Sequence, residues 1–424
     1  MTWTRRMPVV LLSLAVTLPS RRAAADLENP DFLPFGERAA FVANAGLTSA
    51  AGEAVYYNPA NLARIDHPNL SVSGNIYMRF QFETDALLSI DGEDQPFHAA
   101  GFIANPSTLI STYQIGSWSL ATAVLIPEAL TFKNRVAFAS ENLKVTLLQE
   151  SQQESLWIGG GVAHDITPEL HAGLSLFVTR DSTSQLTFLR TETVGAERAV
   201  AELTSNTDQS VLNLVAIGGL YWQAHPRWGI GLRARAPAVK LSGGADIYQA
   251  SVVPGDDANT IEQEFEDVDV SSPAPLDLGA GLSFRATPRL ELLLEASVQL
   301  PATVTTVDEP DIPQIGTTKL DVELAPRVSV GVDWQVLSTW WLRLGALYNR
   351  SALPEPKQSG DTFREDFYGA TGGFAWQKDR TTTALGGFFL YSPIDLVIEG
   401  SDPVRRSEAV EMLYGALLTV AYRL

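Results

Sequence analysis

The sequence predicts an all-β fold, a transmembrane antiparallel β-barrel of about 14 strands. Two observations carry this prediction. Apolar residues alternate with polar or small ones along many runs of about 10 residues, and tight turns alternate with long polar connections. A period of two is typical of a strand with one apolar face. A β-sandwich shows the same alternation, but repeated runs of this length fit a tilted membrane strand better.

A secretory signal peptide is predicted at 1–25. Arg5 and Arg6 form its positive start, and the apolar run that follows is too short to span a bilayer. Small residues at 23–25 suit a signal peptidase, so we expect the mature chain to begin at Asp26. The sequence therefore predicts export and, with the barrel pattern, the outer membrane of a Gram-negative cell.

Composition excludes several classes. The chain has no Cys, which excludes a lipoprotein and a disulfide-stapled domain. Its formal charge of −19 argues against nucleic acid as a partner, because phosphate binding needs a basic footprint. Motifs for a nucleophile elbow, a zinc-binding His pair or a phosphate loop are absent from the sequence, so we expect no enzyme, no metal and no cofactor.

The strands follow from the alternation. In the run 228–236, Trp228, Ile230 and Leu232 share the apolar face, whereas Arg233 and Arg235 lie on the opposite face. We expect strands at 69–83, 97–113, 118–126, 154–164, 169–180, 210–224, 228–238, 275–286, 289–300, 325–336, 339–350, 363–377, 380–391 and 408–423. Extra β-rich segments within 132–206 fit either loop hairpins or strand extensions above the membrane.

The turns give the barrel two different rims. Short turns are predicted at 114–117, 165–169, 225–227, 286–289, 335–339 and 377–380. Long polar connections are predicted at 91–95, 242–269, 305–318 and 351–366. All the tryptophans of the mature chain except Trp157 lie near a short turn, which indicates an aromatic girdle at the periplasmic interface. The last strand, 408–423, resembles the signal read by the outer-membrane assembly machinery, although it ends in Leu424 rather than an aromatic residue.

The segment before the first strand reads ANAGLTSAAGEAVYYNPANLARI over 43–65. It resembles the N-terminal hatch of the FadL family, outer-membrane transporters of long-chain fatty acids and other hydrophobic compounds. The resemblance implies a hatch at 26–67 that plugs the lumen and a barrel at 68–424, with Asn58, Pro59, Ala60 and Leu62 as hatch residues. Pro59 biases Asn58 away from helical geometry, which favours a fixed corner after the helix-prone stretch 37–43. An ordinary Asn-Pro turn is the alternative.

The same resemblance implies a lateral exit at the third strand, where family members release substrate through a gap in the wall. The third strand has no Gly, so Pro127 is the local breaker to which we assign this exit. Sideways release suits apolar cargo, which gains about 0.8 kcal/mol per CH₂ on leaving water.

Basic residues on inward faces are candidates for binding a fatty-acid carboxylate. These are Arg233, Arg235, Lys240 and Arg285. The competing interpretation is a lumen network of ion pairs with the inward acids Asp277, Glu291, Glu295 and Asp333. The acidic run 255–269 fits a solvated extracellular loop, and cation bridging to anionic headgroups is the alternative.

Together these features predict a monomeric channel for passive uptake of long-chain fatty acids or other hydrophobic small molecules, gated by the hatch. Its partners would be a hydrophobic ligand, outer-membrane lipid and lipopolysaccharide, and the assembly machinery. A general diffusion porin and a structural or adhesive barrel are the alternatives, and they predict an open lumen and partner-binding loops respectively.

Overall fold

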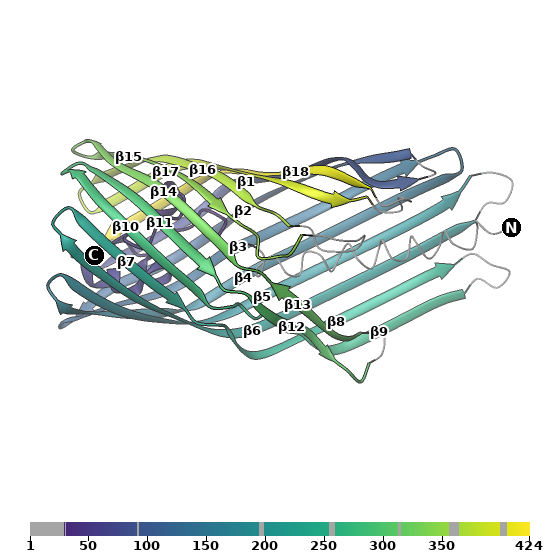
Figure 1. Ribbon diagram of the computed structural model, residues 1–424, viewed down its shortest axis with the longest axis horizontal. Helices are drawn as coiled ribbons and strands as arrows, with labels where there is room; N and C mark the ends of the chain where they lie inside the picture. Colours follow the sequence, from purple (N-terminus) through teal and green to yellow (C-terminus); the bar gives the residue numbers. More distant parts are fainter. Residues whose placement is uncertain are drawn as a thin grey trace.

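The computed structural model describes residues 29, 31–90, 93–194, 199–253, 259–312, 315–355, 364–398 and 405–424. The predicted signal peptide at 1–25 and the expected mature start at Asp26 lie outside these residues. The described chain forms a long antiparallel barrel with a short segment of irregular chain and helical turns inside one end (Figure 1). None of its helices is long and apolar enough to cross a membrane.

Over the described residues, the wall contains eighteen strand segments. These are β1 (Asn69–Ile90), β2 (Glu93–Ile115), β3 (Trp118–Ala139), β4 (Leu143–Thr167), β5 (Leu170–Thr193), β6 (Val200–His225), β7 (Trp228–Arg235), β8 (Val239–Val253), β9 (Asn259–Asp269), β10 (Asp277–Thr287), β11 (Leu290–Gln299), β12 (Ala302–Glu309), β13 (Gly316–Val322), β14 (Ala325–Leu337), β15 (Trp340–Asn349), β16 (Phe367–Lys378), β17 (Thr381–Val397) and β18 (Arg406–Arg423).

Four long strands are interrupted by short breaks. One end of β6 pairs with β7 and the other end pairs with β8, so β7 and β8 are two parts of one strand. The pairs β9 and β10, β11 and β12, and β13 and β14 continue one another in the same way. Pairing of β1 with β18 and of β5 with β6 closes the ring. The predicted barrel of about 14 strands is therefore confirmed.

The two rims differ as the sequence predicts. Each of the six predicted short turns joins two neighbouring strands at one end of the barrel. Outward tryptophans gather there, each between 39% and 51% exposed: Trp118, Trp222, Trp228, Trp334, Trp340 and Trp376. Trp341 is half-buried, and Trp157 points into the lumen, where it is 9% exposed. Tryptophan rings gathered at one rim are typical of an aromatic girdle at a membrane–water interface.

The opposite rim departs from the prediction. Strand β3 runs to Ala139 rather than ending at 126, and β4 begins at Leu143 rather than at 154. The connections predicted at 242–269 and 305–318 are largely strands β8, β9, β12 and β13. The described part of the acidic run, Asn259–Asp269, is likewise a strand and not a loop. Of the two interpretations of 132–206, strand extension is correct. The predicted strand ends and loops are wrong because hydropathy marks only strand parts that face lipid, whereas ladder hydrogen bonds also support polar strands beyond it.

Three short helical turns form the described part of the hatch. They are η1 (Ala39–Val42), α3 (Ala54–Tyr57) and η2 (Pro59–Arg64), and their side chains are mostly buried inside the turn end of the barrel (Figure 1). The helix-prone stretch at 37–43 is confirmed by η1. The hatch lies against β3, β4, β5 and β6 on one side and against β14, β15 and β16 on the other.

Candidate functional site

The predicted corner at Asn58 is the central joint of the hatch. Asn58 is extended (φ −157°, ψ 97°), and its side-chain oxygen accepts from the Ala60 N–H at 3.2 Å, which caps η2. Its amide nitrogen donates to the Leu47 and Leu220 carbonyls at 2.8 and 3.0 Å. Pro59 follows at the first position of η2, where a missing N–H costs nothing. Asn58 thus joins two hatch turns to the wall.

Inward-facing wall glycines make room for the hatch backbone. A Cβ on Gly173 would lie closer than 3 Å to the Pro59 backbone, and a Cβ on Gly345 would meet the Val42 and Ala43 backbone at similar distances. At other wall glycines a Cβ would also lie closer than 3 Å to hatch atoms, which belong to the backbone at Gly231 (Leu47) and to side chains elsewhere: Gly219 (Asn58), Gly279 and Gly281 (Leu47), Gly331 (Val42), and Gly373 and Gly386 (Phe41). We call these nine residues the glycine belt. Such close approach requires positions without a side chain.

Buried carboxylates hold the hatch in place electrostatically. Glu53 is fully buried and accepts from the backbone N–H groups of Glu37, Arg38 and Ala39 at 3.1 to 3.2 Å. The Arg38 guanidinium reaches the wall and pairs with Glu291 and Asp333, each at 2.6 Å. Charge-assisted bonds of this kind are among the stronger ones in proteins. The hatch is therefore tied to the wall by ion pairs as well as by packing.

A second ionic cluster lies higher in the lumen, around Asp31. Arg233 pairs with Asp277 at 2.6 Å and with Asp31 at 3.5 Å, and Arg235 pairs with Asp31 at 3.2 Å. Arg327 bridges both aspartates. Asp31 lies in the hatch segment, outside the strands. Burial alone would raise the pKa of its carboxyl, but attraction to Arg235, Arg327 and Arg233 holds that pKa well below its usual range.

The lumen above the hatch has an apolar inner face. Along β1 the inward residues change from Ser71 and Ser73 to Met78, Phe80 and Phe82, across a bulge that lies after Asn75 in the ladder with β18. Further inward residues extend this surface and are at most 5% exposed: Phe388, Leu390, Ile394, Leu413, Leu417, Val145, Leu147 and Leu189. Rings meet across strands, with Phe80 and Phe132 at 5.8 Å and Phe82 and Phe97 at 5.9 Å. We call this surface the apolar vestibule.

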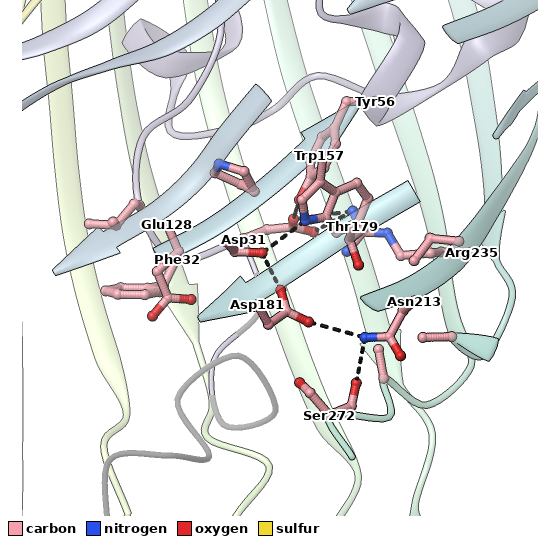
Figure 2. A pocket seen from close by; sticks show the side chains of 16 residues that line it. Asp31, Phe32, Tyr56, Glu128, Trp157, Thr179, Asp181, Asn213, Arg235 and Ser272 are labelled. Carbon is pink, nitrogen blue, oxygen red and sulfur yellow. Dashed lines mark hydrogen bonds and ion pairs between the residues drawn. The ribbon is translucent and has the colours of Figure 1, made fainter. Parts of the chain in front are cut away.

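A cavity of about 70 Å³ lies between the hatch and strands β3 to β7 (Figure 2). Phe32, Leu33, Tyr56, Trp157 and Val215 provide its apolar lining. Polar side chains complete the lining: Asp31, Glu128, Ser155, Thr179, Asp181, Asn213 and Arg235. We call it the hatch cavity.

The hatch cavity contains a chain of hydrogen bonds. Trp157 Nε1 donates to Ser155 Oγ at 3.0 Å, and Ser155 Oγ donates to Asp181 at 2.6 Å. Asn213 Nδ2 donates to the other Asp181 oxygen at 3.1 Å and to the Ser272 carbonyl at 3.2 Å (Figure 2). The amide orientation of Asn213 is fixed by these two acceptors, so its Oδ1 is left as an acceptor.

Pro127 also lines the hatch cavity, at a break in the wall. The ladder between β3 and β4 shifts register between Leu125 and Glu128, so Pro127 lies in a bulge within β3 rather than after the strand. The ladder between β2 and β3 runs from Ile115 and Trp118 only as far as Thr108 and Leu125 over the residues described. This site combines the two devices that weaken a sheet, a bulge and a proline.

A second proline, Pro106, lies on β2 just beyond the last ladder pair with β3, where the ladder between β1 and β2 shifts register. Neither Pro106 nor Pro127 has a backbone N–H to donate. The strands stay adjacent beyond this point, because a Cβ on Gly101 would lie 2.8 Å from the Thr131 carbonyl oxygen. We call this stretch of wall, where β2 and β3 adjoin without ladder pairs, the β2–β3 seam.

The predicted site residues fall into three places. Arg233 and Arg235 meet in the ionic cluster, as the ion-pair interpretation predicts, but only Arg235 lines the hatch cavity. Lys240 pairs with Asp269 on the β8 and β9 extension, and Arg285 lies exposed on β10 near the turn rim. These two do not line the cavity. Ala60 and Leu62 are buried in the hatch beside Asn58 and Pro59.

Sequence reasoning missed several cavity residues. Asp31 lies in an irregular segment with no motif. Asp181 lies just beyond the predicted strand 169–180, and Asn213 lies within the predicted strand 210–224 in a run without a distinguishing pattern. Trp157 carried a usable signal, since it was the one tryptophan predicted away from a turn. Across the part of the chain that the structure describes, no group of three or more His, Asp or Glu residues is placed to hold a metal ion.

No protein-family model matches the chain, and no curated protein matches it in sequence. Solved structures match across nearly the whole fold. A Pseudomonas aeruginosa FadL homologue is 13% identical with a TM-score of 0.63, covering 92% of this chain and 99% of that one. The P. putida toluene transporter TodX is 11% identical with a TM-score of 0.62, covering 93% and 99%. The CymD monoaromatic hydrocarbon channel is 13% identical with a TM-score of 0.60, covering 93% and 98%. At such identities the likeness establishes the shared fold.

Proposed function

We propose that this chain is a FadL-type outer-membrane channel for the passive uptake of hydrophobic small molecules, and not an enzyme. The observation that carries the proposal is the apolar vestibule, a cluster of buried apolar side chains on the inner wall that extends to the hatch residues Phe32, Leu33 and Phe41. Water-filled barrels carry a polar interior, whereas phenylalanine and leucine on the inner wall lower the free energy of an apolar solute there. The similar structures, a FadL homologue, a toluene transporter and a hydrocarbon channel, support the same class.

The proposed route begins in the vestibule and ends at the β2–β3 seam. Pro127 lines the hatch cavity and also lies in the seam, so it connects the interior with a weakened part of the wall. The paired part of β2 and β3 covers 108–115 and 118–125. A tilted strand crosses a bilayer in about 9–11 residues, so the seam begins near the outer part of the membrane. Cargo leaving there enters lipid without crossing the hatch.

In this proposal the hatch seals the lumen against ions and water. Its backbone is fitted to the glycine belt, and Arg38 ties it to Glu291 and Asp333. For gating, we propose that this segment shifts enough to widen the hatch cavity toward Pro127, so that cargo reaches the seam while the hatch stays in the lumen. We further propose a monomer in the outer membrane of a Gram-negative cell, with lipid and lipopolysaccharide as its surroundings and the assembly machinery inserting it. Transport with the gradient needs no cofactor.

Deleting 26–65 tests the sealing role and separates this proposal from a general diffusion porin. The full protein should conduct ions poorly in planar bilayers, and the deletion variant should conduct strongly. A barrel already conducting with its hatch in place is a porin and contradicts the proposal. An adhesive barrel would lose surface binding on loop deletion, with no change in the uptake of an apolar solute.

A further inference from the structure

We propose that the hatch cavity is a head-group subsite that selects neutral cargo bearing a hydroxyl group and rejects carboxylates. This inference rests on the proposed uptake of hydrophobic molecules and names their class. The apolar body of such a molecule would lie in the vestibule, and its hydroxyl would enter the cavity. About 70 Å³ is enough room for a small polar group such as a hydroxyl.

The buried hydrogen-bonding groups of the cavity fit a hydroxyl. Asn213 is 1% exposed, and its Oδ1 has no hydrogen-bond partner among the residues described. Arg235 is 5% exposed, and its Nε likewise has none in that part of the chain. Both side chains line the cavity. A hydroxyl is one donor and an acceptor, so it can donate to Asn213 and accept from Arg235, whereas an alkane satisfies neither group.

The charges of the cavity oppose a carboxylate. Asp181 and Glu128 are both in the lining, and Arg235 is the single basic residue among the lining residues that the structure describes. The charge of Arg235 already faces Asp31 at 3.2 Å. A carboxylate head would enter beside two further carboxylates in a poorly hydrated site, where like charges repel strongly.

Two aromatic rings restrict the movement of the Arg235 guanidinium. The Arg235 guanidinium lies over the rings of Tyr56 and Trp157, at 4.7 and 5.5 Å from their centroids. These rings stabilise the cation through their faces and limit its movement toward an incoming anion. Figure 2 shows Tyr56 and Trp157 on one side of the cavity and Asp181 and Asn213 on another, with Arg235 beside them. A hydroxyl can use Arg235 without displacing Asp31.

The test is competitive displacement of a fluorescent apolar probe from the purified full-length barrel in detergent at neutral pH. Competitors are a straight-chain alcohol, carboxylate and alkane of equal carbon number. We expect the alcohol to bind roughly tenfold tighter than the carboxylate. Asn213→Leu should weaken the alcohol roughly three- to tenfold, the value of one hydrogen bond, and leave the alkane unchanged. Asp181→Asn should strengthen carboxylate binding severalfold.

Asn206→Leu is the matched control. It lies on the same strand but is half-buried, outside the hatch cavity, with its amide bonded to Asp208, so none of the three affinities should change. Equal or tighter binding of the carboxylate to the unmodified protein would overturn the inference. So would an equal loss for alcohol and alkane in Asn213→Leu. If the alkane and alcohol both fail to bind the unmodified protein, the proposed uptake function itself fails.

Discussion

The two halves of the lumen are built on different principles. The turn half is filled by backbone, since the hatch is pressed against the glycine belt and tied by Arg38 to Glu291 and Asp333. The vestibule is lined by large apolar side chains such as Phe80 and Phe388. Close backbone packing and buried ion pairs make a seal with one geometry, whereas an apolar surface accepts solutes of many shapes. Under the proposed function, this difference would let one barrel exclude ions and still admit apolar molecules.

The largest effect should come from breaking the seal at the glycine belt. Gly345→Val places a branched side chain against the Val42 and Ala43 backbone, which cannot move aside as a flexible side chain would. Overpacking of this kind costs about 1–3 kcal/mol or more, so the displaced-hatch population should rise roughly tenfold or more. Ion conductance in planar bilayers measures it. Gly244→Val, whose Cβ would meet nothing within 4 Å, should conduct like the unmodified protein.

The second-largest effect should come from closing the proposed exit at the β2–β3 seam. The chain has no Cys, so a designed pair at Gly101→Cys and Thr131→Cys can fasten the β2–β3 seam on oxidation. Uptake of an apolar solute by intact cells should fall to near background and return on reduction, because the strands can no longer part. A pair at Ser111→Cys and Thr122→Cys lies in the existing ladder and should not alter uptake. Full uptake through the oxidised seam would place the exit elsewhere.

A smaller effect is expected at the hatch corner. Asn58→Ala removes two donated hydrogen bonds and the η2 cap, at about 1 kcal/mol each, so the hatch should lose roughly 2–3 kcal/mol of stability. Protease cleavage of the hatch in the folded barrel reports this loss. Asn58→Asp keeps the cap and loses both donated hydrogen bonds. Its hatch should therefore be cleaved faster than the hatch of the unmodified protein. An unchanged rate in both variants contradicts the role of Asn58 as a joint.

The smallest effect lies in the vestibule. Phe80→Asn places an amide in an apolar surface and should lower uptake of an apolar solute severalfold, with ion conductance unchanged. Phe80→Leu preserves an apolar surface and should retain most uptake. A rise in conductance in Phe80→Asn would show that the two halves of the lumen are not independent.

Much of this division was predictable from sequence, for identifiable reasons. Alternation located the membrane parts of the strands, and the Asn58-Pro59 pair predicted the hatch corner because its chemistry is local. Arg233 and Asp277 were both predicted to face inward, and their ion pair confirms the network interpretation. Asp31 was not predictable, because a residue in an irregular segment acquires its partners only when the hatch folds into the barrel.

The β2–β3 seam was likewise only partly predictable from the sequence. Pro127 was predicted as a breaker after the third strand, but it lies inside β3 at a bulge. The strand continues because polar residues beyond the membrane still pair with β4, which hydropathy does not reveal. The end of the ladder at Thr108 and Leu125 depends on the register between β2 and β3, which a single sequence does not contain.

The most direct test is uptake of a labelled apolar solute by cells that display the unmodified protein, with ion conductance of the purified barrel recorded in parallel. A plugged hydrophobic channel predicts rapid, saturable uptake together with negligible conductance. Steady conductance without solute uptake would contradict the account and identify a water-filled pore.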